Sequence, residues 1–258
     1  MKKRVDVLGI KFDNLSFSEA EGIIKNSLSQ KSYLSIFTPN PEIALAAQKD
    51  TSLLAIINSS SLVLADGVGI VIASQILGSP IRERVAGIDI GELILGMANE
   101  NKLRVFLLGG KETVAKMAGE KIKKRYPHFT VCGAHHGYFE KEGEENDAVV
   151  KEIASASPDI IFVCFGFPEQ ERWIYENCVK IPSVTLSAGL GGALDVWSGN
   201  VRRSPKFLQK LGLEWLWRII VQPKRIKVLF HIPIFFLKIL RQKQLSKQKN
   251  SQKGSDFQ

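Results

Sequence analysis

Residues 104–110 read Arg-Val-Phe-Leu-Leu-Gly-Gly, a short apolar run that ends in two glycines. An apolar run without alternating polar side chains is typical of a strand that is buried on both faces of a sheet. A helical pattern covers residues 113–126, directly after the glycines. Strand, tight turn and helix in this order form the repeating unit of a parallel α/β fold.

The same unit recurs along most of the chain. Apolar runs that we interpret as strands lie at 5–10, 33–38, 62–65, 131–134, 159–165 and 184–187. This repetition predicts an α/β fold, a doubly wound, Rossmann-like and mostly parallel sheet with helices on both faces. Ligands bind beyond the carboxyl ends of the strands in such sheets. The candidate functional positions therefore follow strands, at 38–42, 66–67, 109–111, 166–170 and 188–195.

Charge is divided unevenly along the chain. The 258 residues carry a formal net charge of +9, yet residues 201–258 alone hold 14 Lys or Arg and two acidic residues. Residues 1–200 hold 21 basic and 24 acidic residues. We therefore expect three parts: an α/β domain at 1–200 that carries the site, a basic amphipathic helical appendage at 201–241, and a disordered Lys/Gln-rich tail at 242–258.

The appendage has the composition of an interfacial membrane element. Residues 228–240 are mostly apolar, but His231, Pro233 and Lys238 interrupt them. As a helix they would extend roughly 20 Å, which is less than the hydrocarbon core of about 30 Å. We expect the segment to lie on an anionic membrane surface. An amphipathic helix packed on the body or on a partner subunit is the alternative, and the apolar content argues against nucleic acid as a partner.

The setting and assembly of the chain follow from smaller signals. Three cysteines without metal or redox spacing favour a reducing compartment, and the N-terminus lacks a signal-peptide pattern. With the appendage, this predicts a cytoplasmic protein that is peripheral on the inner face of the cell membrane. The helical pattern at 208–221 is rich in Trp and would also suit a homo-oligomer.

Two strand ends carry the strongest chemical candidates. Asp66 follows a short apolar strand, where partial desolvation would raise the pKa of its carboxyl and suit a general base. The alternative for Asp66 is an N-cap of the next helix. Thr38 and Asn40 stand in a turn with two prolines, which stiffen it and set where the polar side chains point. A capped helix start with Pro41 in its first turn is the plain alternative.

Other signals concern phosphate and metal. Gly109-Gly110 and the glycines around Gly191 follow strands and would let backbone N–H groups approach a phosphate, although neither completes a nucleotide-binding motif and tight turns explain both equally well. Arg84 lies in a loop from which it could bind phosphate bidentately. No Asp-x-Asp pair occurs, and adjacent histidines such as His135 and His136 rarely share one metal. We expect no metal site.

The assembled motifs resemble those of the WecG/TagA/CpsF glycosyltransferase family, most of all its TagA branch. The resemblance runs from about residue 5 to 230 and is specific as a set. It rests on Thr-Pro-Asn-Pro-Glu at 38–42, Ala-Asp-Gly-Val-Gly at 65–69, Arg-Val-Ala-Gly-Ile-Asp at 84–89, Gly-Phe-Pro-Glu-Gln-Glu at 166–171, Gly-Gly-Ala-Leu-Asp at 191–195, Arg-Ser-Pro at 203–205 and Leu-Glu-Trp-Leu-Trp-Arg at 213–218.

The resemblance implies an inverting transfer of N-acetylmannosamine from its UDP derivative to the C4 hydroxyl of N-acetylglucosaminyl-diphospho-undecaprenol. The product is the β-1,4 linkage unit of teichoic acid, and neither metal nor other cofactor is expected. Asp66 takes the position of the proposed base and Thr38 that of its polar partner. Lipid diphosphate is expected at Arg218, Arg225 and Lys224. The expected substrate-binding residues are Asn40, Gly67, Arg84, Gly109, Gly110, Gln170 and Gly191.

Three alternatives remain at this point. The same family also includes enzymes for other UDP-sugars, such as N-acetylmannosaminuronic acid or a hexose for other surface polysaccharides. A non-catalytic, membrane-tethered nucleotide-binding protein comes from another class. A nicotinamide-dependent oxidoreductase is disfavoured, because neither glycine cluster matches the dinucleotide fingerprint.

Overall fold

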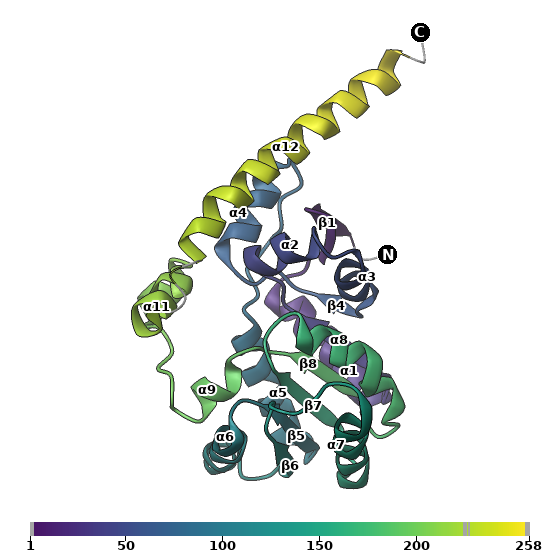
Figure 1. Cartoon of the computed structure of the whole chain (residues 1–258), viewed down its shortest axis with the longest axis vertical. Coiled ribbons are helices and arrows are strands. Elements are labelled where there is room, and N and C mark those ends of the chain that lie inside the picture. Colours follow the sequence, from purple (N-terminus) through teal and green to yellow (C-terminus); the bar gives the residue numbers. More distant parts are fainter. Residues whose placement is uncertain (1–2, 224–225, 227, 256–258) are drawn as a thin grey trace.

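A six-stranded parallel sheet forms the centre of the computed structural model, which describes residues 3–223, 226 and 228–255 (Figure 1). The strand order is β4-β3-β8-β7-β5-β6, and every neighbouring pair is parallel. The strands are β3 (Leu34–Phe37), β4 (Leu62–Val63), β5 (Arg104–Gly109), β6 (Thr130–His135), β7 (Ile160–Cys164) and β8 (Leu186–Gly189).

Helices cover both faces of this sheet. Alternate residues of β5 enter different cores: Phe106 and Leu108 join one cluster, Val105 and Leu107 the other. The first cluster includes α2 (Pro41–Ala47), α3 (Thr51–Ser59), α4 (Val68–Ile76), α7 (Gly143–Ala156) and α8 (Glu169–Asn177), which a 3-10 turn at Cys178–Lys180 follows. The second includes α1 (Phe17–Gln30), α5 (Gly87–Asn101), α6 (Glu112–Arg125) and α9 (Ala193–Trp197). The predicted doubly wound α/β fold is confirmed.

The N-terminal segment differs from the prediction of a single strand at 5–10. It forms an antiparallel hairpin of β1 (Arg4–Val7) and β2 (Ile10–Asp13), separate from the main sheet. The chain reverses at Leu8 and Gly9, which both adopt positive φ. The Asp13 carboxylate accepts a hydrogen bond from the backbone N–H of Val63 at 2.9 Å and so attaches the hairpin to β4. The apolar run at 5–10 therefore contains a turn at Leu8 and Gly9, which its apolar composition did not indicate.

The segment expected as one helix at 208–221 is divided into α10 (Lys206–Lys210) and α11 (Glu214–Val221). Gly212 separates them with a φ of 70°. A Cβ atom at this position would lie 2.8 Å from Cβ of Val68, on the first turn of α4. A glycine is needed here for two reasons, the positive φ and the close approach of the appendage to α4.

The last helix, α12 (Val228–Ser255), is longer than expected. The sequence predicted disorder from residue 242, whereas the helix continues to Ser255, in keeping with the good helix propensity of Gln and Lys. Phe235 and Ile239 are fully buried in the core that contains α2 and α4. The side chain of Gln242 accepts a hydrogen bond from the backbone N–H of Leu8 at 2.9 Å. The change of composition near residue 200 is therefore not a boundary in packing.

Among the described residues, no helix has both the length and the apolar content needed to cross a bilayer.

Burial of Phe235 predicts that docking of α12 contributes to stability. Phe235→Ala should lower the free energy of unfolding by about 3 kcal/mol, because a large buried ring is lost. Phe230→Ala is the matched control, since that ring on the same helix is 71% exposed and its loss should change stability by less than about 0.5 kcal/mol. Urea unfolding measures both. Equal small effects would mean that α12 does not pack on the body in solution.

Candidate active site

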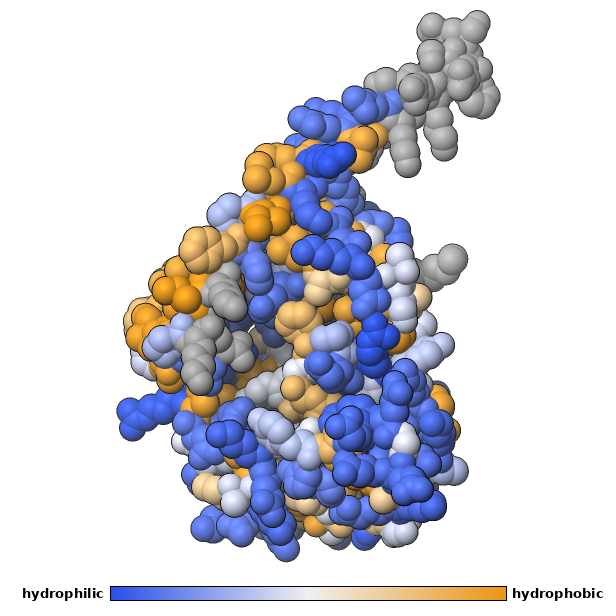
Figure 2. Space-filling view, viewed as in Figure 1, coloured by the Kyte–Doolittle hydropathy of each residue, from blue (hydrophilic) through white to orange (hydrophobic). Residues whose placement is uncertain are grey.

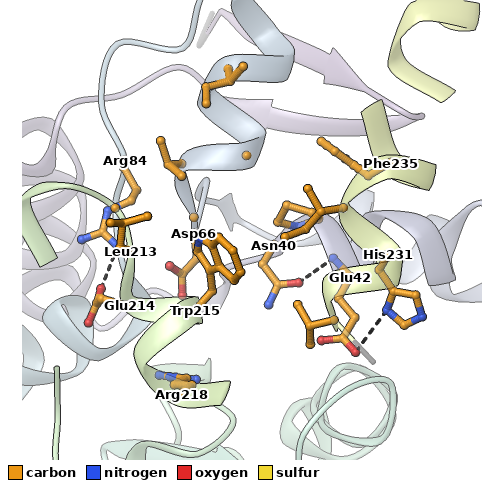
Figure 3. Close-up of a pocket in the computed structure, with 18 of the residues that line it drawn as sticks. Asn40, Glu42, Asp66, Arg84, Leu213, Glu214, Trp215, Arg218, His231 and Phe235 are labelled. Carbon is orange, nitrogen blue, oxygen red and sulfur yellow. Dashed lines mark hydrogen bonds and ion pairs between the residues drawn. The ribbon is translucent and has the colours of Figure 1, made fainter. Parts of the chain in front are cut away.

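A cavity of about 310 Å³ lies between the α/β body and the appendage (Figure 3). The body contributes the ends of β3 and β4 and the first turns of α2 and α4, and the appendage contributes α11 and α12. The lining is mostly apolar, with a few polar side chains that converge on it. The polar members are Asn40, Glu42, Asp66, Arg84, Glu214, Arg218 and His231.

Asp66 lines this cavity, three residues after Val63, the last paired residue of β4. Its Oδ2 accepts a hydrogen bond from the backbone N–H of Gly87 at 3.2 Å. The residue keeps some surface on the cavity side, but its carboxyl is largely removed from water. This burial raises the pKa of the Asp66 carboxyl, against the opposing charge of Arg218, the Gly87 hydrogen bond and the charge of Arg84. A carboxylate with a raised pKa is a stronger proton acceptor.

Thr38 and Asp66 both lie against Gly87, although Thr38 is not among the described residues that line the cavity. A Cβ atom on Gly87 would be 2.6 Å from the Thr38 hydroxyl oxygen. The same glycine donates its N–H to Asp66. Gly87 thus brings together the two residues that the sequence predicted as catalytic, although they follow different strands.

Asn40 and Gly67 form the rim on the side of α2 and α4. The Asn40 side-chain oxygen caps α2 by accepting hydrogen bonds from the backbone N–H groups of Glu42 and Ile43, at 2.9 and 3.0 Å. Its amide nitrogen points away from this cap and toward the cavity (Figure 3). Gly67 opens α4 with a φ of 103° and also lines the cavity. The capping alternative therefore holds for the oxygen of Asn40, while its nitrogen remains available to a ligand.

Arg84 is held by the appendage. Its Nη1 donates to Glu214 Oε2 at 2.7 Å, and its Nη2 donates to the backbone carbonyl of Gln209 at 3.4 Å. The sequence predicted Arg84 as a phosphate ligand. The structure gives it a structural partner from a segment 130 residues away, while leaving it on the cavity wall.

Glu214 is the residue at this junction that the sequence did not single out. Besides Arg84, its carboxylate accepts from the Ser204 hydroxyl at 3.2 Å and lies 3.6 Å from Nε of Arg203. Burial alone would raise the pKa of the Glu214 carboxyl, but the Arg84 hydrogen bond and the charges of Arg84 and Arg203 outweigh it and lower the pKa. The sequence signal that could have identified Glu214 is its position as a lone acidic residue in the basic appendage, where it is expected to form an ion pair with Arg or Lys.

Arg218, one turn after Glu214 on α11, lines the cavity opposite the α2 rim (Figure 3). Its positive charge is the largest of the effects that oppose burial at Asp66. The appendage thus supplies a cation to a site whose carboxyl comes from the body. Lys224 and Arg225, predicted with Arg218 as ligands of a lipid diphosphate, lie outside the described residues.

The remaining predicted residues lie along the same edge of the sheet, at the ends of β5, β7 and β8. Gly109 has a φ of 135°, and a Cβ there would lie 2.5 Å from the carbonyl oxygen of Cys164, so only glycine fits. Gly110 accepts a hydrogen bond from the backbone N–H of Gly137 at 2.9 Å. Gly191 follows β8, the neighbour of β3. In the described part of the chain these residues and Gln170 do not border the cavity around Asp66.

Gln170 is buried and its amide is engaged within the protein. Its Oε1 accepts from the backbone N–H of Gly191 at 2.9 Å, and its Nε2 donates to Glu171 Oε1 at the same distance. A Cβ on Gly189 would lie 3.1 Å from Gln170 Nε2, so the side chain packs directly on β8. Gln170, predicted to bind substrate, therefore stabilises the turn at Gly191 in this structure.

Glu171, which the sequence did not single out, anchors this arrangement. It is 2% exposed, and its second oxygen is buried with no hydrogen-bond partner among the described residues. Burial raises the pKa of the Glu171 carboxyl to about 7, against the opposing hydrogen bond from Gln170. Within the described residues no group of three or more His, Cys, Asp or Glu side chains is placed to hold a metal ion.

The chain is similar in sequence to a known family and to named proteins. Residues 5–249 match the glycosyl transferase WecG/TagA/CpsF family. The N-acetylglucosaminyldiphosphoundecaprenol N-acetyl-beta-D-mannosaminyltransferase of Bacillus subtilis (strain 168) is 39% identical over 223 residues, which are 86% of this chain and 85% of that protein. The protein of the same name from Staphylococcus aureus (strain NCTC 8325 / PS 47) is 38% identical over 247 residues, 95% of each chain.

The raised pKa of Glu171 predicts a pH-dependent stability. The ordinary value is 4.5 and the folded value about 7, so the unfolded chain loses the proton first as pH rises. Stability should fall between pH 4.5 and 7 by on the order of 3 kcal/mol from this group. Glu171→Gln should remove that part of the decline in urea unfolding at pH 5 and pH 8. Glu176→Gln, an exposed change on the same helix, should keep it, and an unchanged decline in both variants would contradict the assignment.

Proposed function

The chain belongs to the WecG/TagA/CpsF family of glycosyltransferases, and from that premise we propose that it transfers N-acetylmannosamine from UDP-N-acetylmannosamine to N-acetylglucosaminyl-diphospho-undecaprenol. The activity for which the Bacillus and Staphylococcus relatives are named supports this choice of acceptor and sugar. The structural observation that carries it is the desolvated Asp66 carboxyl in a cavity that Arg218 of the appendage completes.

The reaction we propose is a single displacement at C1 of the donor sugar. The Asp66 carboxylate takes the proton of the acceptor C4 hydroxyl, whose oxygen attacks C1 from the face opposite the diphosphate. The bond between C1 and the diphosphate oxygen breaks, and UDP leaves with its electron pair. Attack from the opposite face inverts the anomeric centre and gives a β-1,4 linkage. Burial helps Asp66 because it raises the pKa and so the basicity of the carboxylate.

Positioning and charge account for the other residues. The Thr38 hydroxyl, fixed against Gly87, and the Asn40 amide nitrogen are suited to orient the acceptor sugar. Arg218 is suited to stabilise negative charge on a diphosphate. We propose that the UDP moiety lies along the sheet edge over the turns at Gly109, Gly110 and Gly191. We propose that cations and backbone N–H groups, without a metal or other cofactor, stabilise the negative charge of its diphosphate, since the sequence has no Asp-x-Asp pair.

An anionic membrane surface is the proposed location of this chemistry, on the inner face of the cell membrane. The outward side of α11 and α12 carries an exposed apolar band (Figure 2). Basic residues of the appendage, among them Arg202, Lys206 and Arg241, accompany it. A band of this kind suits the boundary between headgroups and hydrocarbon. Pairing of two copies through the same band is the alternative use of it. The exposed apolar residues of the band on α11 and α12 are Leu216, Ile220, Val221, Leu229, Phe230, Ile234, Leu237 and Leu240, and Phe207, Leu211 and Ile226 add to them from α10 and the connecting segments.

Loss of the base should remove turnover without unfolding the protein. Asp66→Asn should lower the rate of UDP release from UDP-N-acetylmannosamine in the presence of acceptor by about 10³-fold, the usual scale for a general base. Asp147→Asn, an exposed change on α7, should leave the rate unchanged. UDP release from wild-type protein should also require the acceptor. Turnover of Asp66→Asn near the wild-type rate, with circular dichroism unchanged, would reject Asp66 as the base.

The membrane surface is tested separately. Phe230→Ser combined with Leu237→Ser should weaken binding to vesicles of anionic phospholipid at least about tenfold, because two exposed apolar groups no longer enter the interface. Tyr175→Ser, at an exposed position on α8, is the control and should bind as wild type does. Sedimentation with vesicles at low and high salt measures both. Wild-type binding by the double variant would place the membrane contact elsewhere.

A further inference from the structure

The cavity around Asp66 has two ends of different chemistry. Asp66, Glu214 and Arg218 occupy one end, and Phe235 lies across the cavity from Glu214 and Arg218 (Figure 3). Apolar side chains from three helices make up the rest of the wall: Val68 and Ile72 from α4, Ile219 from α11, and Val228, Ile232, Phe235 and Phe236 from α12. A ligand that fills this space therefore needs a polar part followed by a hydrocarbon part.

The helix α12 is apolar on two sides, and they face different surroundings. One side carries Phe230, Ile234 and Leu237, which are exposed on the surface of the protein. The other side carries Val228, Ile232 and Phe235, spaced four and three residues apart, and it faces the cavity. A bilayer in contact with the first side does not reach the second, because α12 and its contacts with α2 and α4 lie between them. The inner apolar wall is thus unexplained by membrane contact.

We infer that this inner wall binds the first isoprene units of a polyprenyl diphosphate, the acceptor carrier, and draws them out of the bilayer. The inference rests on the proposed function and adds a hydrocarbon subsite to it. A lipid-linked acceptor presents sugar, diphosphate and hydrocarbon in that order. The cavity presents Asp66 and Arg218 at one end and the apolar wall between α4 and α12 at the other. Positive charge at Arg218 complements the diphosphate, and 310 Å³ lies within the range of about 300–1,000 Å³ that small-ligand sites occupy.

This subsite would set which carriers the enzyme accepts. A chain that enters the cavity removes apolar surface from water on both partners, so affinity should depend on the prenyl group as well as on the diphosphate. Sugar and diphosphate would be held at a fixed depth relative to Asp66, because the first isoprene units are fixed beside them. Such positioning is a way to convert binding of a remote group into orientation at the reacting centre.

The test uses farnesyl diphosphate and inorganic diphosphate as probes, titrated by calorimetry into the full-length protein without vesicles. Wild type should bind farnesyl diphosphate at least about tenfold more tightly than inorganic diphosphate, because the prenyl group is buried. Ile72→Trp should remove most of this difference by filling the wall, and Ile72 is 38% exposed, so the fold should tolerate the larger ring. Ile232→Trp fills the opposite wall and should act in the same way. Val179→Trp, at a 68% exposed position after α8, is the matched control and should keep the difference.

Equal affinity of wild type for the two probes would overturn the inference, as would a preference that both filling variants retain. A transfer assay separates this from the proposed function. Acceptors with N-acetylglucosaminyl diphosphate on a methyl or a farnesyl group are compared in detergent-free solution. Equal use of both would overturn the subsite and leave the transferase intact. If neither acceptor causes release of UDP, while farnesyl diphosphate still binds in a way that depends on Ile72, the proposed function would be rejected and the subsite would stand.

Discussion

The ion pair between Arg84 and Glu214 joins the two parts of the chain from which the site is built. Arg84 belongs to the loop between α4 and α5, and Glu214 begins α11 of the appendage. Both side chains are largely withdrawn from water, so the pair is screened less than a surface pair. Ser204 and Arg203 add further contacts to the same carboxylate. Removing either partner would leave a buried charge uncompensated, which makes docking of α11 and the order of the Arg84 loop interdependent.

The basicity of the Asp66 carboxylate depends on docking of the appendage against the body. Walls from α11 and α12 remove its carboxyl from water, and this raises its pKa; the same helices deliver Arg218, whose charge acts in the opposite direction. A body without its appendage would therefore present a more solvated carboxylate that also lacks the opposing charge of Arg218. Gly87 makes the arrangement compact, since its N–H binds Asp66 and its missing side chain admits Thr38.

The appendage also connects location with chemistry. One helix, α12, carries an exposed apolar side and a side that closes the cavity, and its Phe235 and Ile239 are part of the core beneath α2 and α4. The same helix therefore takes part in both the exposed surface and the cavity wall. Further along the sheet edge, beyond β8, Gln170 holds the Gly191 turn by accepting from its backbone N–H and is itself held by a buried hydrogen bond to Glu171.

The sequence by itself determined the features that depend on local pattern. Apolar runs ending in glycine predicted the parallel sheet, strand ends marked Thr38, Asp66 and Gly191, and the charge split marked the appendage. Only the tertiary structure decided which of these meet. The turn at Leu8 and Gly9, the pairing of Arg84 with Glu214 and the internal use of Gln170 were not predicted, and packing of the last helix on the body was only an alternative. Composition and spacing report what a residue can bind. Partners that are up to 236 residues away, as Gln242 is from Asp6, are selected by packing of the whole chain.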